Sequence, residues 1–122
     1  MQVKTKRCDS VVALRLTGPI VIGETTTLRD AVLSQSDAKA IVLDLAGVRI
    51  IDAAGLGAML ELRAATESKG IRFRLMNLTR TVSELLEITC LNSVFEITSG
   101  LRNKAVTTHL QQLNYSQLNF AG

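Results

Sequence analysis

The stretch Ile50-Ile51-Asp52-Ala53-Ala54-Gly55-Leu56-Gly57 decides the fold of this chain, because an apolar strand-like pattern changes there into a helical pattern within a few residues. Before it, Ala40–Leu45 is a short, nearly continuous apolar run, which predicts a central strand covered on both faces. After it, apolar residues recur at helical spacing over Gly55–Ser68, and Lys69-Gly70 ends the expected helix. Because loops on rigid scaffolds often carry function, this junction is the candidate functional site.

Elements of alternating type are expected on both sides of the junction. The polar pair Asp9-Ser10 separates two strand-like runs and predicts an opening hairpin. Strands and helices alternate after it, which is typical of an α/β domain with βαβ units and one mixed sheet. The expected strands are Val3–Cys8, Val11–Thr17, Ala40–Leu45, Ile71–Asn77 and Val94–Thr98. About four helices are expected, one beginning near Glu24 or Thr25 and ending by Ser36, then Gly55–Ser68, Thr79–Thr89 and Leu101–Leu113.

Length and composition predict one globular domain. The chain has 122 residues, of which 47% are hydrophobic, enough to build a packed core. We expect the domain to occupy residues 1–113 and a C-terminal tail to occupy 114–122. No run of about 18 apolar residues is present to span a bilayer, and no apolar leader follows Met1, so we expect a cytoplasmic protein without membrane insertion.

Charge and chemistry-bearing residues argue against several classes of function. A net charge of +3 with 3% aromatic residues is too little for a nucleic-acid surface with stacking platforms. Cys8 and Cys90 lie far apart without metal-ligand spacing, so we expect reduced cysteines and no metal site. His109 has no patterned nucleophile or carboxylate partner. The sequence therefore predicts no catalytic residues, no cofactor and no enzyme.

Two runs carry a family likeness. Ile41-Val42-Leu43-Asp44-Leu45-Ala46-Gly47-Val48 followed by Ile51-Asp52-Ala53-Ala54-Gly55-Leu56-Gly57 resembles the central signature of STAS domains, the family of bacterial anti-sigma factor antagonists and their relatives. The likeness continues through Leu75–Leu91 and covers roughly Val11 to Ile97. It implies a protein that binds an anti-sigma factor of the switch-kinase type, so that the kinase releases its sigma factor.

The signature departs from the family pattern at one position. In the family, the residues between the aspartate and the glycine are usually serines, and the second is the phosphate acceptor, which corresponds to Ala54 here. Alanine has no hydroxyl, so this position is not phosphorylatable. A phosphate would bring about −1.5 to −2 charges to the helix start and disrupt an interface there. We therefore expect a constitutive antagonist or scaffold partner, controlled by expression or by another site.

The roles of individual residues at the junction remain open from sequence. Asp52 occupies an N-cap position, where its carboxylate accepts hydrogen bonds from the amide of Ala54 or Gly55, and it is also a candidate contact for a partner's cation. Gly55 and Gly57 admit close approach, either of the sheet or of a partner.

Two stripes are expected on the helix after the junction. One holds Leu56, Met59, Leu60 and Ala64, and the other holds Ala58, Leu62 and Ala65. The second stripe is either exposed as a partner surface or buried under a neighbouring helix. The predicted partner-binding residues are Asp52, Ala53, Ala54, Gly55, Leu56, Gly57, Ala58 and Leu62.

Three functions remain open from the sequence. The first is the antagonist described above, whose partner is an anti-sigma factor or a related switch-protein kinase. The second is a STAS scaffold subunit of a stress-sensing or transport-associated complex, and the third is a module that binds a small ligand or nucleotide at the helix start. The anionic Asp52 and the lack of a GxxxxGK[ST] motif argue against the third. A homodimer is also open.

Overall fold

The computed structural model describes residues 1–98 and shows one five-stranded mixed sheet in the order β1-β2-β3-β4-β5. Only β1 is antiparallel to its neighbour, and the other strands run parallel. The strands are β1 (Gln2–Cys8), β2 (Val11–Thr17), β3 (Ala40–Gly47), β4 (Arg72–Met76) and β5 (Glu96–Thr98). The helices are α1 (Thr25–Leu33), α2 (Ala53–Ser68), α3 (Arg80–Ile88) and the short 3₁₀ helix η1 (Leu91–Ser93). The predicted α/β class and opening hairpin are confirmed.

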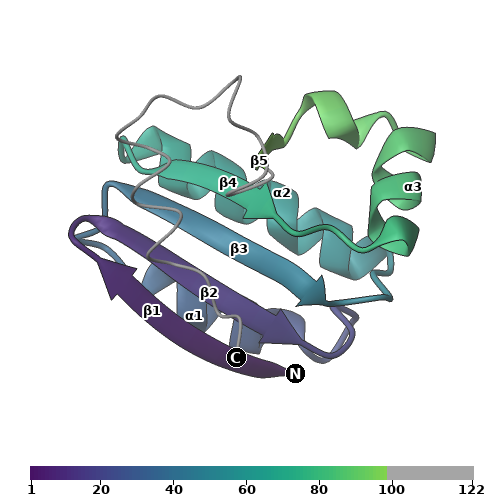
Figure 1. Cartoon of the computed structure of the whole chain (residues 1–122), viewed down its shortest axis with the longest axis horizontal. Coiled ribbons are helices and arrows are strands. Elements are labelled where there is room, and N and C mark those ends of the chain that lie inside the picture. Colours follow the sequence, from purple (N-terminus) through teal and green to yellow (C-terminus); the bar gives the residue numbers. More distant parts are fainter. Residues whose placement is uncertain (99–122) are drawn as a thin grey trace.

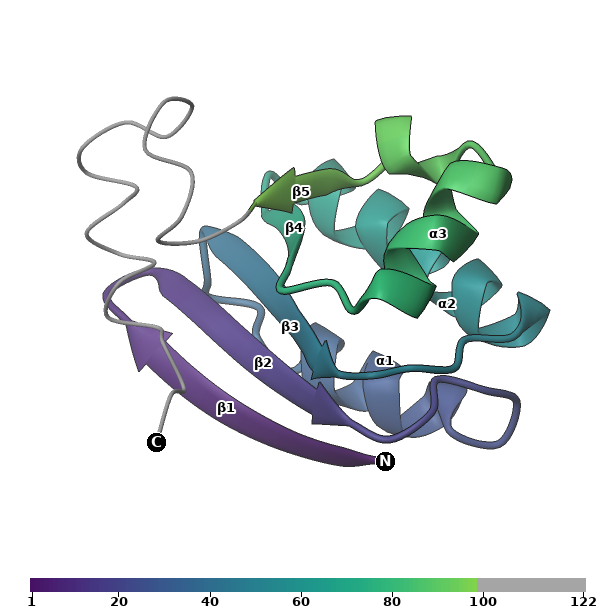
Figure 2. The ribbon, with the colours of Figure 1, turned by 45° about the vertical axis from the view of Figure 1, so that its right-hand side comes forward.

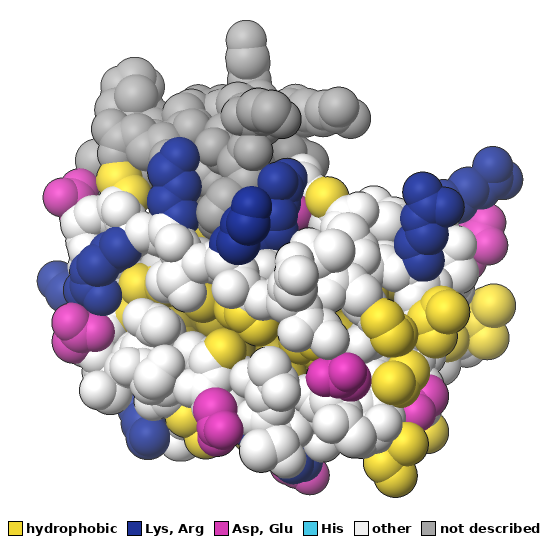
Figure 3. Space-filling model, turned by 90° about the horizontal axis from the view of Figure 1, so that it is seen from below, with side chains coloured by type: hydrophobic (Ala, Val, Ile, Leu, Met, Phe, Trp, Pro, Cys, Tyr) yellow, Lys and Arg dark blue, Asp and Glu magenta, His cyan; other side chains and the backbone are white. Residues whose placement is uncertain are grey.

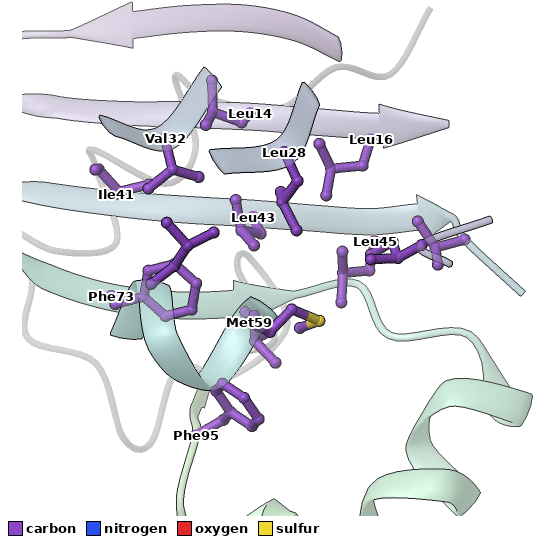
Figure 4. Close-up of a cluster of buried hydrophobic side chains, with 14 of the residues drawn as sticks. Leu14, Leu16, Leu28, Val32, Ile41, Leu43, Leu45, Met59, Phe73 and Phe95 are labelled. Carbon is purple, nitrogen blue, oxygen red and sulfur yellow. The ribbon is translucent and has the colours of Figure 1, made fainter. Parts of the chain in front are cut away.

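The helices α1 and α2 lie side by side along one face of the sheet, and α3 lies beside the end at which β3 passes into α2 (Figures 1 and 2). The parallel pairing places Leu14, Leu43 and Leu75 in one row across β2, β3 and β4. All three side chains are fully buried, and Figure 4 shows Leu14 and Leu43 within the core. Parallel neighbours need a crossover connection, and the crossover helices cover the face that these leucines share.

The central strand is buried on both faces, as its apolar run predicts. Val42 lies on the face opposite to α1 and α2, where it forms a second apolar cluster with Ala13 and Met76. The single charged residue of the strand, Asp44, is also fully buried. Arg15 pairs with it at 3.3 Å, and the amide of Ala46 donates to its Oδ1 at 3.0 Å. A charge is tolerated here because it is paired and hydrogen-bonded.

Several element boundaries differ from those expected. The last strand begins at Glu96, because Val94 caps η1 and Phe95 turns into the core. α2 begins at Ala53, two residues before the expected start at Gly55. The expected start rests on the spacing of apolar residues, and the small residues of the first turn add little to that pattern. Among residues 1–98 there are three α-helices, and the expected fourth helix, Leu101–Leu113, and the tail 114–122 lie outside the described residues.

The expected division of α2 into two stripes is wrong. Ala58, Met59 and Leu62 all belong to one buried face, with 1%, 0% and 2% of their surface exposed. Residues three or four positions apart share one side of a helix, so Met59 and Leu62 cannot face opposite ways. Ala58 and Leu62 therefore lie on the buried face of α2 and do not form an exposed partner surface, which corrects their assignment as binding residues.

Candidate functional site

Asp52 is the N-cap of α2, as predicted, and it also holds a second loop. Its Oδ1 accepts a hydrogen bond from the amide of Gly55 at 2.8 Å. Its Oδ2 accepts one from the amide of Ile22, in the loop between β2 and α1, at 3.0 Å. The extended backbone at Asp52 is the conformation that an N-cap requires. Both carboxylate oxygens are thus occupied by backbone amides, and the side chain fixes two loops to each other.

These hydrogen bonds also determine the charge of the site. The amide of Ile22, followed by that of Gly55, lowers the pKa of Asp52 from its ordinary value of 3.8, because both stabilise the carboxylate form. The positive end of α2 favours the same form. A negative charge therefore already occupies the start of α2, where a phosphate-bearing ligand would have to bind.

A close backbone crossing places the two loops in contact. The amide of Ile20 donates to the carbonyl of Ile50 at 2.9 Å, and the amide of Asp52 donates to the carbonyl of Ile20 at 3.3 Å. Ile20 and Ile51 form an isolated parallel bridge, which extends the β2–β3 pairing past the ends of both strands. The loop before α1 is therefore part of the junction, although it lies about thirty residues away in the sequence.

The two signature glycines have different roles. Gly55 is buried, and a Cβ atom at this position would overlap the carbonyl oxygen of Ile20. Gly57 is partly exposed, and a Cβ atom there would meet no atom within 4 Å. Gly55 is thus required for packing inside the domain. The fold itself gives no reason for glycine at position 57, within α2.

Small and apolar side chains form the accessible part of the junction. Ala53 is exposed and Ala54 is partly exposed, whereas Leu56 packs partly against the core. Ile22 and Ile50 leave 77% and 61% of their surface exposed. We call the set Ile22, Ile50, Ala53, Ala54 and Gly57 the junction surface. In Figure 3, hydrophobic side chains gather at the right-hand end of the molecule, the end where Figure 1 places α3 and the start of α2.

The structure therefore keeps only part of the predicted binding set accessible. Ala53, Ala54 and Gly57 are exposed or partly exposed. Asp52 and Gly55 make contacts within the domain that hold the two loops together. Ala58 and Leu62 are buried. Sequence reasoning missed Ile22, because its position depends on a hydrogen bond to a residue far along the chain.

Within residues 1–98, no three His, Cys, Asp or Glu side chains are arranged to hold a metal ion. Within the same range no helix has both the length and the apolar character needed to cross a membrane. His109 lies outside the described residues.

The chain matches the STAS domain family over residues 2–111. It belongs to the STAS domain family. The match includes the junction at Asp52–Gly57, where Ala53 and Ala54 stand between the aspartate and the glycine.

Solved structures share the STAS fold at low sequence identity. A candidate anti-sigma factor antagonist from Thermotoga maritima is 24% identical, with 78% of this chain and 84% of that chain covered and a TM-score of 0.71. The antagonist SpoIIAA in its unphosphorylated form is 16% identical, with 88% and 100% covered and a TM-score of 0.68. A sulfate transporter family protein from Wolinella succinogenes is 18% identical, with 91% and 88% covered and a TM-score of 0.70. SpoIIAA from Bacillus is also similar in its phosphorylated form.

Proposed function

We propose that this chain is a non-catalytic anti-sigma factor antagonist. It binds an anti-sigma factor or a related switch-protein kinase through the junction surface and thereby frees a sigma factor. The observation that supports this most is the group of exposed or partly exposed apolar and small residues around the start of α2, namely Ile22, Ile50, Ala53, Ala54 and Gly57. Contiguous exposed apolar area marks interaction sites more often than it marks plain surface. The proposal includes a cytoplasmic location and no nucleic-acid partner.

Gly57 supports the proposal independently of the exposed isoleucines. A glycine within a helix costs about 0.5–1 kcal/mol of stability relative to alanine. A Cβ atom at this position would have no neighbour within 4 Å, so packing inside the domain does not require a glycine here. A glycine here lets the backbone of a partner approach the first turns of α2 closely. Its benefit would therefore come from binding and not from the stability of the isolated domain.

Ala54 determines how binding is regulated. In the antagonists with a serine at this position, phosphorylation adds charge and bulk at the start of α2. In this chain the position is partly exposed and bears only a methyl group. The junction surface therefore stays in a form that resembles the unphosphorylated state, and the complex is governed by the amounts of the two proteins.

Binding to the anti-sigma kinase encoded in the same genome tests this function. We expect the chain to form a complex with the kinase in the presence of ATP, measured by biolayer interferometry, with no phosphate on the Asp52–Gly57 peptide by mass spectrometry. Gly57→Gln should weaken the complex at least about tenfold by obstructing close approach. Ala64→Gln is the matched control, because Ala64 lies exposed two turns later on the same helix. No complex with any anti-sigma kinase would exclude the antagonist function.

A second candidate function is a scaffold subunit of a stress-sensing or transport-associated complex. The similarity of fold to the Wolinella succinogenes sulfate transporter family protein favours this alternative. In such a complex the junction surface docks on a neighbouring subunit rather than on a kinase. Gene neighbourhood discriminates between them, because a kinase or sigma factor gene nearby supports the first function and sensor or transporter genes support the second.

A further inference from the structure

A solvent-open hollow adjoins the junction surface. Gly18, Pro19, Gly47, Arg49 and Ile50 line it, and its volume is about 210 Å³. Pockets for small molecules usually have about 300–1,000 Å³. This hollow is smaller, its lining is almost entirely apolar, and it shares Ile50 with the junction surface. Its size fits one aliphatic side chain better than a cofactor.

Two glycines let the chain segments that line the hollow approach each other closely. Gly18 has a φ of +107°, a left-handed conformation that side-chain-bearing residues rarely adopt, and its amide donates to the carbonyl of Gly47 at 3.0 Å. A Cβ atom on Gly47 would lie 3.0 Å from the carbonyl oxygen of Leu16. The chain at the ends of β2 and β3 is therefore closely packed at these two glycines, beside the hollow.

Arg49 adds a positive charge to this apolar site. Its side chain is exposed and makes no ion pair or hydrogen bond with any residue in 1–98. By contrast, Arg15 pairs with Asp44 and Arg29 pairs with Glu61. Asp52, three residues further on, directs both carboxylate oxygens to backbone amides. The charge of Arg49 is thus available to an acidic group from outside.

We propose that the hollow receives an aliphatic side chain of the partner protein whose neighbouring residue is acidic, and that this carboxylate pairs with Arg49. Three observations support this occupant: the single-side-chain volume, the apolar lining and the available cation. Continuity through Ile50 makes the hollow an extension of the junction surface. The inference rests on the proposed function for the identity of the partner, but the chemistry of the contact is testable without that partner.

Blocked peptides test the hollow directly. The ¹⁵N-labelled chain is titrated with acetyl-Gly-Leu-Glu-Gly-amide and with acetyl-Gly-Leu-Lys-Gly-amide at millimolar concentrations. We expect saturable shifts of the Gly18, Gly47 and Ile50 amides with the Leu-Glu peptide and about fivefold weaker binding of the Leu-Lys peptide. Arg49→Gln should abolish this difference. Arg72→Gln is the control, because Arg72 is also exposed but lies on β4, away from the hollow.

Three outcomes would overturn the inference. Absence of shifts with the Leu-Glu peptide would show that the hollow does not bind an aliphatic side chain next to an acidic one. Equal binding of both peptides would show that Arg49 does not select the acidic residue. Concentration-dependent self-association in analytical ultracentrifugation that Arg49→Gln abolishes would identify a second copy of the chain as the occupant instead. Neither measurement contains a kinase, so failure of this inference is distinguishable from failure of the antagonist function.

Discussion

The carboxylate of Asp52 accepts a hydrogen bond from the amide of Ile22, thirty residues away, at 3.0 Å. Its other oxygen accepts one from Gly55 at 2.8 Å. The sequence predicts Asp52 as a helix cap. In the structure Asp52 also positions the loop that bears Ile22, an exposed residue of the junction surface. This one carboxylate therefore links the loop before α1 to the first turn of α2.

We expect Asp52→Ala to destabilise the domain more than Asp52→Asn. Alanine leaves the amides of both Ile22 and Gly55 without their acceptor, whereas asparagine retains one carbonyl oxygen for capping. Thermal unfolding by circular dichroism gives the order of stability. Amide hydrogen exchange should show faster exchange at Ile22 in both variants. Equal melting temperatures of Asp52→Ala and the unmodified chain would contradict the bridging role.

The lowered pKa of Asp52 predicts a dependence of stability on pH. Folding favours the carboxylate form, so this contribution is complete above the ordinary pKa of 3.8 and is lost as the pH falls through the lower pKa of the folded state. The melting temperature of the unmodified chain should therefore decrease more steeply below about pH 3.8 than that of Asp52→Asn. Parallel pH profiles of the two proteins would show that Asp52 does not contribute.

The two signature glycines should respond oppositely to alanine. Gly55→Ala places a methyl group onto the carbonyl oxygen of Ile20, and overpacking of this kind costs about 1–3 kcal/mol. Gly57→Ala meets open space and should stabilise the isolated domain by about 0.5–1 kcal/mol. Urea unfolding of both variants measures the difference. A loss of stability in Gly57→Ala would refute the view that this glycine is not needed by the fold.

Restoring a hydroxyl at position 54 should restore regulation, if the antagonist function holds. We expect the kinase to phosphorylate Ala54→Ser on that residue, with loss of the complex, because the added negative charge lies beside the carboxylate of Asp52. Ala54→Glu should weaken binding without ATP. Phosphopeptide mass spectrometry and biolayer interferometry measure the two effects, and Ala64→Ser serves as the exposed control on the same helix. Undiminished binding by phosphorylated Ala54→Ser would refute a constitutive role for Ala54.

Asp44 should be important for stability rather than for binding. It is fully buried, pairs with Arg15 at 3.3 Å and accepts a hydrogen bond from the side-chain amide of Asn77 at 3.3 Å. Breaking a buried ion pair by removing one partner costs about 3–5 kcal/mol, and the partial exposure of Arg15 places Asp44→Ala toward the lower end of that range. Urea unfolding measures the loss, and Glu61→Ala, which breaks an exposed pair, should change stability little.

Local patterns identified most of the elements and part of the site. Val11–Thr17 was predicted with its observed bounds, and the unbroken apolar run through Leu43 correctly indicated a strand buried on both faces. The N-cap role of Asp52 also followed from sequence, because a cap acts on amides only a few residues away. Periodicity and capping are local properties, so the residues that produce them are neighbours in the chain.

The sequence by itself determined the order of elements, the STAS signature and the absence of a hydroxyl at Ala54. Only the tertiary structure decided that Leu62 belongs to the core, that Gly55 and Gly57 differ, and that Ile22 joins the junction surface. Each of these depends on which residues of another segment lie opposite. That information arises when β2 and β3 pair and bring their following loops together, because contacts between distant segments leave no periodic trace in the chain.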